Sequence, residues 1–195
     1  MSLGGGGLEG LTNSAIQALI DASVSDALDA HQKFSFSSAD LQNPNNSDWS
    51  NAGLTALAPA AADSNNAALS VRLFDDTTQE GVGFQLVVPS GMSSMTIGYI
   101  SRAETAPAGT RQVGIRLCER GIADNGAIIA WDCLALNDVD LPANELFQYQ
   151  EQTLSPPSLS VTAGELTQFE LLRVPAVGTN LPGDWALLQL NIEFN

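Results

Sequence analysis

Acidic side chains are the residues of this chain whose type and spacing could do chemistry. They form two groups in the sequence, Asp75, Asp76 and Glu80 in one, and Asp132, Asp138, Asp140 and Glu145 in the other. Paired carboxylates can cleave glycosides, and several together can bind calcium. Neither group has the spacing of a calcium-binding loop, and solvated loops of an acidic protein collect such residues without a function. We therefore expect no catalytic residue and no metal site, with glycoside cleavage and calcium binding as the alternatives.

Histidine and cysteine are too few for nucleophilic catalysis or for a zinc site. His31 is the only histidine, and Cys118 and Cys133 are the only cysteines. Triad catalysis needs a histidine beside the nucleophile, and zinc needs several Cys or His ligands close together. Motifs that bind phosphates or dinucleotides are absent as well. The sequence predicts no enzymatic activity and no cofactor.

For Cys118 and Cys133 we expect buried free thiols, as in a protein made in a reducing cytoplasm. If the two cysteines lie opposite each other in a hairpin, they could instead pair as a disulfide.

The large aromatic side chains could form a platform that stacks on sugar rings. They are Trp49, Trp131, Trp185, Tyr99 and Tyr149. In a β-sandwich such side chains more often fill the core. The alternating residues that flank Trp131 and Tyr99 favour the core for these two.

Alternating apolar residues predict the strands that must position all of these side chains. From residue 69 onward, apolar side chains occupy every second position in segments 82–88, 95–99, 113–117, 147–149 and 169–171. The last segment is the clearest, with Leu188, Leu190, Ile192 and Phe194 expected to face the core. A further strand is expected within 49–57, between loops rich in Asn, Pro, Ala and Ser. About eight strands with no helical pattern between them predict an all-β fold, an antiparallel jelly-roll β-sandwich.

The first 33 residues are expected to form a separate N-terminal arm and one short helix, and residues 34–195 the β domain. The glycine run at 4–7 predicts a flexible attachment arm, with Leu3, Leu8 and Leu11 as candidate contacts. A helix is predicted over 13–31. Its apolar stripe contains Ile16, Leu19, Ile20, Val24 and Leu28. This stripe either starts a trimeric stalk or packs on the β domain.

The negative charge of the chain disfavours nucleic acids and anionic membranes as partners. Seven basic against 22 acidic residues give a formal charge of −15, which repels phosphate backbones and anionic membranes. We therefore expect neither nucleic acid nor membrane as a partner. The opening MSLGGGGLEG lacks the basic and apolar regions of a signal peptide, so we expect a protein that is not exported by one.

Two parts of the chain, 74–125 and 146–194, carry a likeness to a known group. They contain in order a GVGF strand, an SRAETAPAG loop, an FQY strand, a TAGELTQFEL strand and a closing LPGDW turn. In this order of features the chain resembles β jelly-roll proteins of tailed-phage virions. Residues 1–66 lie outside the likeness. The resemblance implies a jelly roll in a virion, made in the cytoplasm of a bacterial host, that acts by binding.

Such jelly rolls occur in capsid decoration (cement) proteins, in tail fibres and in the head-binding parts of spikes. Compactness, the absence of catalytic motifs and the N-terminal arm favour a homotrimeric decoration protein bound to the major capsid protein. The alternative is a short tail fibre or receptor-binding tip. It would anchor its N-terminus to a tail protein and bind a host surface glycan through the jelly roll.

Overall fold

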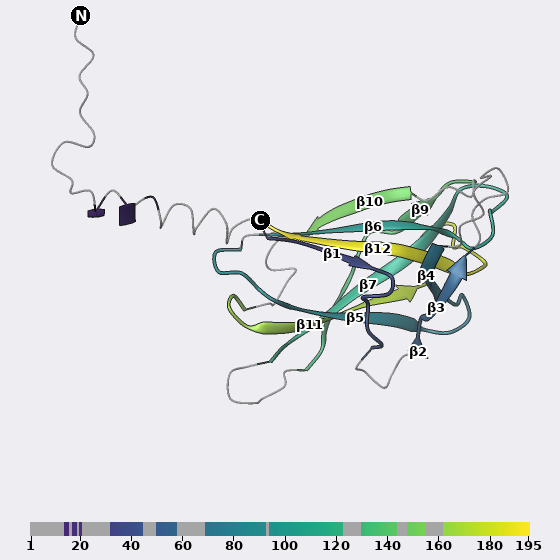
Figure 1. Cartoon of the computed structure of the whole chain (residues 1–195). Coiled ribbons are helices and arrows are strands. Elements are labelled where there is room, and N and C mark those ends of the chain that lie inside the picture. The colour runs from purple at the N-terminus through teal and green to yellow at the C-terminus, as the bar shows by residue number, and fades with distance from the viewer. Residues whose placement is uncertain are drawn as a thin grey trace, which may run out of the picture.

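The computed structural model contains two β-sheets packed face to face (Figure 1). It describes residues 14–15, 17–18, 20, 32–44, 50–57, 69–92, 94–122, 130–143, 148–154 and 162–195. The strands are β1 (Lys33–Ser37), β2 (Ser50–Asn51), β3 (Gly53–Leu57), β4 (Leu69–Phe74), β5 (Glu80–Val87), β6 (Met95–Ala103), β7 (Arg111–Ile122), β8 (Asp132–Ala135), β9 (Val139–Leu141), β10 (Gln148–Leu154), β11 (Leu166–Val174) and β12 (Trp185–Phe194). The prediction of a β-sandwich with two antiparallel sheets is therefore confirmed for the described residues from 32 onward.

Each sheet contains six strands. The first has the order β10-β6-β12-β4-β3, and β1 also pairs with β12. The second has the order β2-β5-β11-β7-β8, and β9 also pairs with β7. The strand pairs are antiparallel except for β2 with β5, which is parallel. Strand β12 lies inside the first sheet, so its residues pair on both sides.

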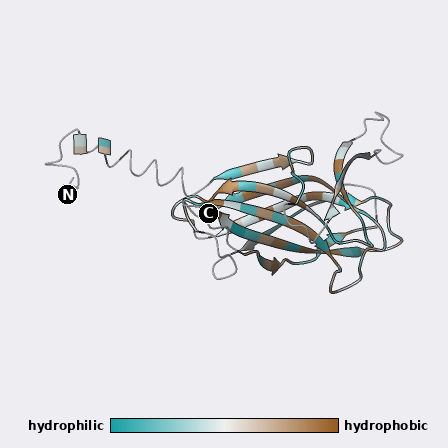
Figure 2. Cartoon of the chain, turned by 90° about the horizontal axis from the view of Figure 1, so that it is seen from below, coloured by the Kyte–Doolittle hydropathy of each residue, from teal (hydrophilic) through white to brown (hydrophobic). Residues whose placement is uncertain are grey.

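The core lies between the two sheets and is filled by the alternating residues. Figure 2 shows hydrophobic and hydrophilic residues alternating along the strands. In the segments predicted around 82–88, 95–99, 113–117 and 169–171, the apolar side chains at every second position are buried, as expected. Phe84 of β5 stacks on Phe169 of β11 with ring centroids 5.1 Å apart. Burial of such side chains away from water supplies most of the driving force for folding.

The final strand differs from its prediction at one position. Leu190, Ile192 and Phe194 are fully buried, but Leu188 is partly exposed and Leu187 is buried in its place. The pairing of β12 with β6 shifts register between Leu187 and Gln189. An extra residue in one strand reverses which later positions face the core. The expectation for Leu188 was wrong because this irregularity cannot be seen in an alternating sequence.

A buried arginine holds the loop segment that precedes β3. Arg72 of β4 is 6% exposed and donates to the backbone oxygens of Ser38 at 2.9 Å, of Ala52 at 3.1 Å and of Leu41. Leu41 and Ala52 are themselves buried. A guanidinium has several donors in a fixed fork, so one side chain can satisfy several carbonyls of an irregular segment.

Two aromatic side chains lie elsewhere than expected. Tyr149 is 53% exposed, because the side chains of β10 that face inward are the glutamines at neighbouring positions. Trp131 is only partly buried, and the Arg120 guanidinium lies 4.4 Å from its ring centroid. Tyr99 and Trp185 are buried as predicted, while Trp49 and Phe147 lie outside the described residues.

The two cysteines form a disulfide, so the expectation of free thiols was wrong. Cys118 of β7 and Cys133 of β8 are directly paired across the two strands, with their Cα atoms 4.0 Å apart. The antiparallel register brings the two sulfurs together, which was the alternative left open by the sequence.

Most of the predicted N-terminal arm and helix lies outside the described residues. This holds for Leu3, Leu8, Leu11, Ile16, Leu19, Val24 and Leu28. Ile20 is described, is helical and is 49% exposed. Within the described part of the chain there is no helix with the length and apolar character needed to cross a membrane.

Candidate functional site

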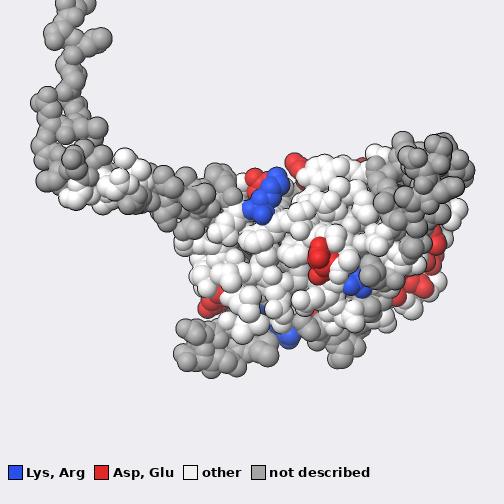
Figure 3. Space-filling model, viewed as in Figure 1, with Lys and Arg blue, Asp and Glu red and all other residues white. Residues whose placement is uncertain are grey.

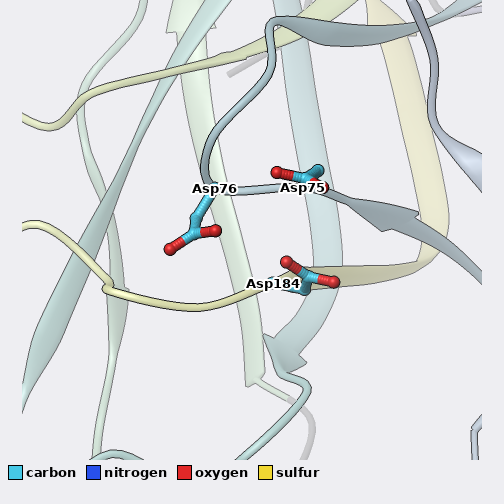
Figure 4. Close-up of side chains that lie close together, drawn as sticks. All are labelled: Asp75, Asp76 and Asp184. Carbon is cyan, nitrogen blue, oxygen red and sulfur yellow. The ribbon is translucent and has the colours of Figure 1, made fainter.

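Three carboxylates from two distant turns come together at one end of the sandwich. Trp185 at the start of β12 pairs with Phe74 at the end of β4, so the residues just outside this pair must be neighbours. These residues are Asp184 on one side and Asp75 with Asp76 on the other. Their carboxylates each offer an oxygen within 4.8 Å of the others (Figure 4).

The acidic groups at this end of the sandwich, which also include Glu80, differ in the direction in which their pKa values are shifted. Asp75 Oδ1 accepts from Thr77 N at 2.6 Å and from Thr78 N at 3.2 Å, and the bonds to Thr77 hold the pKa of Asp75 below its usual value. Burial raises the pKa of Asp184 and of Glu80, and the neighbouring carboxylates raise both further. The cluster therefore holds carboxylates that repel one another.

Arg173 supplies the positive charge beside this cluster. It is 5% exposed, and it donates to the backbone oxygens of Phe74 at 2.8 Å and of Leu181 at 3.0 Å. Burial lowers its pKa, while Asp76, Asp184, Asp75 and Glu80 all act in the opposite direction. A cavity of about 350 Å³ adjoins these residues and is lined in part by Asp75, Asp76 and Arg173.

This arrangement is a junction of two turns in which one buried arginine offsets part of the charge of the surrounding carboxylates. Calcium takes six to eight oxygen ligands, so the three grouped carboxylates could supply such a site only if they bound in bidentate fashion or with further oxygen ligands. The sequence identified Asp75, Asp76 and Glu80 but missed Asp184 and Arg173. Only the pairing of β4 with β12 brings Asp184 next to Asp75 and Asp76.

The residues of the second acidic group lie elsewhere. Asp138 and Asp140 lie around β9, Asp132 lies in β8, and Glu145 is outside the described residues.

An exposed tyrosine lies on the outer face of the first sheet. The Tyr149 side chain of β10 rests on Gly98 of β6, where it occupies the space that a side chain would take. A Cβ built on Gly98 would stand 2.8 Å from Tyr149 Oη and 3.1 Å from Cε2. The glycine thus allows an aromatic ring to lie against the sheet with about half of its surface open to solvent.

Hydrogen-bonding side chains continue from this ring across the same sheet, through Glu151 on one side and Asn191 on the other. Tyr149 Oη donates to Glu151 Oε2 at 2.6 Å, which raises the pKa of Tyr149. Ser35 Oγ and Gln189 Nε2 each donate to Asn191 Oδ1 at 2.8 Å. Asn191 also lies close enough to Tyr149 to influence the pKa of its hydroxyl. We call these five residues the Tyr149 surface.

Few charges lie on the face of the molecule shown in Figure 3. Lys and Arg cover only small areas, and the acidic side chains are few except at the right-hand edge of the sandwich, where several lie close together. The ion pair of Lys33 Nζ with Glu193 Oε2, at 2.8 Å, joins β1 to β12 and is exposed to solvent. An exposed aromatic ring beside amide and carboxylate groups can bind a ligand that has both apolar and hydroxyl faces.

Comparison with known proteins identifies no family for this chain. No family model matches it, and no curated protein matches it either.

Solved structures with a similar arrangement include viral proteins and carbohydrate-binding modules. The enzymatically active domain of bacteriophage CBA120 tailspike protein 4 has a TM-score of 0.41 and 8% identity, over 85% of this chain and 19% of that chain. The CBM22-2 xylan-binding domain from Paenibacillus barcinonensis Xyn10C has a TM-score of 0.47 and 13% identity, over 83% of this chain and 99% of that chain. A chain in the structure of the infectious bursal disease virus Gx strain has a TM-score of 0.34 and 10% identity, over 84% of this chain and 33% of that chain. Likenesses this weak assign neither a family nor a function.

Proposed function

We propose that this chain is a non-enzymatic structural protein of a tailed-phage virion that binds a glycan through the Tyr149 surface. Residues 1–33 attach it to another protein of the same virion. The observation that carries the proposal is the exposed Tyr149 ring, which is seated on Gly98 and lies between Glu151 and Asn191. An aromatic face stacks on a sugar ring, while amide and carboxylate groups accept or donate hydrogen bonds to its hydroxyls.

The order of the strands supports a jelly roll as the scaffold. Strands β4-β12-β6-β10 in one sheet face β5-β11-β7-β8 in the other. From β4 to β12 the chain changes sheet at every step except from β7 through β8 to β9, which all lie in the second sheet, and this gives the double-sheet arrangement of a jelly roll. Jelly rolls occur in viral capsid proteins and in lectin domains, so the scaffold suits both a virion protein and a glycan binder.

The tail-fibre form of this proposal is tested by glycan binding. We expect Tyr149→Ala to weaken binding of host surface polysaccharide at least tenfold, measured by titration calorimetry, because the stacking face is lost. Tyr149→Phe keeps the ring and is expected to retain most of the affinity. Equal affinities of the wild-type and Tyr149→Ala proteins would overturn the assignment of this surface.

Capsid decoration is the second candidate, and it uses the same attachment by residues 1–33. The junction of this segment with the sandwich supports either candidate, since all five residues of β1 pair with β12. A homotrimer that binds only the expanded capsid lattice would stabilise that lattice by mass action. Cryo-electron microscopy of intact virions separates the candidates, because decoration requires density on the head and a fibre requires density on the tail.

Deletion of residues 1–12 tests the attachment in both cases. We expect the shortened chain to keep its folded sandwich, measured by its unfolding temperature, and to lose binding to virions that lack the protein. Undiminished binding would place the attachment on the sandwich instead.

A further inference from the structure

We infer that a slot between β9 and β10 is a second ligand site, which takes one neutral, hydroxyl-rich ring such as a single sugar residue. The choice of a sugar rests on the proposed function. The site itself rests on two buried polar atoms that have no hydrogen-bond partner in the part of the chain that the structure describes. The slot has a volume of about 310 Å³. Its lining residues are Tyr99, Asn137, Asp138, Val139, Asp140, Gln150, Glu151 and Gln152.

The first of these atoms is the hydroxyl oxygen of Tyr99. Tyr99 is 2% exposed, and its hydroxyl has no hydrogen-bond partner among the described residues. Burial raises the pKa of this hydroxyl well above its usual value, so it keeps its proton and can donate. Buried polar groups in proteins are nearly always satisfied, and one left open beside a cavity indicates a missing partner in that cavity.

The second atom is Oε1 of Gln150. The other end of this amide is fixed, because Gln150 Nε2 donates to Asp140 O at 2.7 Å. Oε1 is buried and has no partner among the described residues. Gln150 pairs directly with Tyr99 across β10 and β6, so the two side chains project from the same face of the sheet. A donor and an acceptor therefore open into one slot.

Hydrogen bonds hold the walls of the slot in place before any ligand binds. Asn137 N donates to Gln152 Oε1 at 2.7 Å, which links the segment before β9 to β10. Gln112 Nε2 donates to Asp140 Oδ1 at 2.8 Å. A preformed site loses little conformational entropy on binding.

The lining residues define the class of ligand. Asp138 and Asp140 place negative charge around the slot, and no Lys or Arg is among the lining residues, so anionic ligands are repelled. A sugar hydroxyl both donates and accepts, which matches the open Gln150 oxygen and the open Tyr99 hydroxyl. The volume lies at the lower end of the range for ligand pockets, which suits a single ring.

The test follows the Gln150 side-chain amide of the full chain by two-dimensional NMR during titration. The probes are the methyl glycosides of glucose, galactose, mannose and N-acetylglucosamine, with that of sialic acid as the anionic control. We expect a saturable shift with at least one neutral probe and none with the sialoside. Tyr99→Phe removes only the open hydroxyl and should weaken this binding at least tenfold, whereas Tyr149→Ala should leave it unchanged.

Each outcome separates this inference from the proposed function. No shift of the Gln150 amide with any neutral glycoside, or equal affinity of the Tyr99→Phe protein, overturns the slot and means that water alone fills it. Loss of polysaccharide binding in Tyr149→Ala with a silent Gln150 amide keeps the proposed function and removes the slot. A shift at Gln150 with no effect of Tyr149→Ala on polysaccharide binding keeps the slot and removes the Tyr149 surface.

Discussion

At the scale of single residues, Arg173 is the group on which the end of the sandwich depends. Its guanidinium satisfies the carbonyls of Phe74 and Leu181 and lies among carboxylates that would otherwise repel one another. We expect Arg173→Met to lower the free energy of unfolding by about 3–5 kcal/mol, because two buried carbonyls and several carboxylates lose their compensation. Urea denaturation at neutral pH measures the change.

Arg116 provides the matched control for this substitution. It lines the same cavity but is exposed. Arg116→Met is expected to change the free energy of unfolding by no more than about 0.5 kcal/mol. Similar losses for both variants would mean that overall charge, and not the buried contacts of Arg173, is responsible.

The acidic cluster also predicts how stability depends on pH. The pKa values of Asp184 and Glu80 are raised in the folded protein, so the folded state binds more protons than the unfolded one as pH falls through these values. The free energy of unfolding should therefore rise on acidification from about pH 7 to about pH 5. Below this window it should fall again, because the lowered pKa values of Asp75 and Asp40 act in the opposite sense.

Asp184→Asn removes one of the two raised groups and should make the rise with acid smaller. Urea midpoints of both proteins at the two pH values provide the comparison. An identical pH dependence in the variant would show that repulsion at this cluster does not affect stability.

Residue types could be predicted from the sequence better than residue groupings. The sequence indicated that Asp75, Asp76 and Glu80 stand together, because they are close along the chain. It gave no sign of Asp184 or Arg173, since their proximity depends on which strands pair. The pairing of Cys118 with Cys133 depends in the same way on the register of β7 with β8.

At the scale of the elements, the register shift in β12 decides which leucine belongs to the core. Leu187 is fully buried, and Leu188 is partly exposed. We expect Leu187→Ala to cost about 2–5 kcal/mol through the cavity that it leaves, and Leu188→Ala to cost clearly less. Denaturation midpoints of the two variants test this directly. A larger loss for Leu188→Ala would mean that β12 alternates without interruption.

Strands inside the sheets were predictable because burial of one face imposes strict alternation. The prediction failed at the edge strand β10, where Gln148, Gln150 and Gln152 face inward and Tyr149 faces outward. At the edge of a sandwich the inner side chains can reach backbone groups of the other sheet, as Gln150 does with Asp140. Polar residues are therefore tolerated inside, and the alternation of apolar residues no longer indicates which face is buried.

At the scale of the whole molecule, the sequence predicts a homotrimer. A helix over 13–31 is marginal alone in water, and its apolar stripe needs a partner surface. Light scattering of the full chain should give about three times the mass of one chain, and deletion of residues 1–31 should reduce this to one chain. A full chain that stays monomeric at micromolar concentration would contradict the prediction.

The overall class of fold followed from composition and alternation, but the arrangement of the strands did not. Turn-rich, alternating segments without helices between them left few choices other than a sandwich. The parallel pairing of β2 with β5 and the division of one side of β12 between β4 and β1 depend on contacts between segments far apart in the chain. No local pattern records such contacts.

The pairing of β1 with β12 has a mechanical consequence. The chain enters the sheet at Lys33, opposite Glu193 and close to the C-terminus (Figure 1). Tension that pulls the N-terminal segment along the axis of β1 would load the five residue pairs of this ladder together, in shear. It would not peel them apart one at a time. Because β12 also pairs with β6 along most of its length, the load would pass directly into the middle of the sheet. The sandwich would therefore resist being torn from its attachment at the point where the chain enters it.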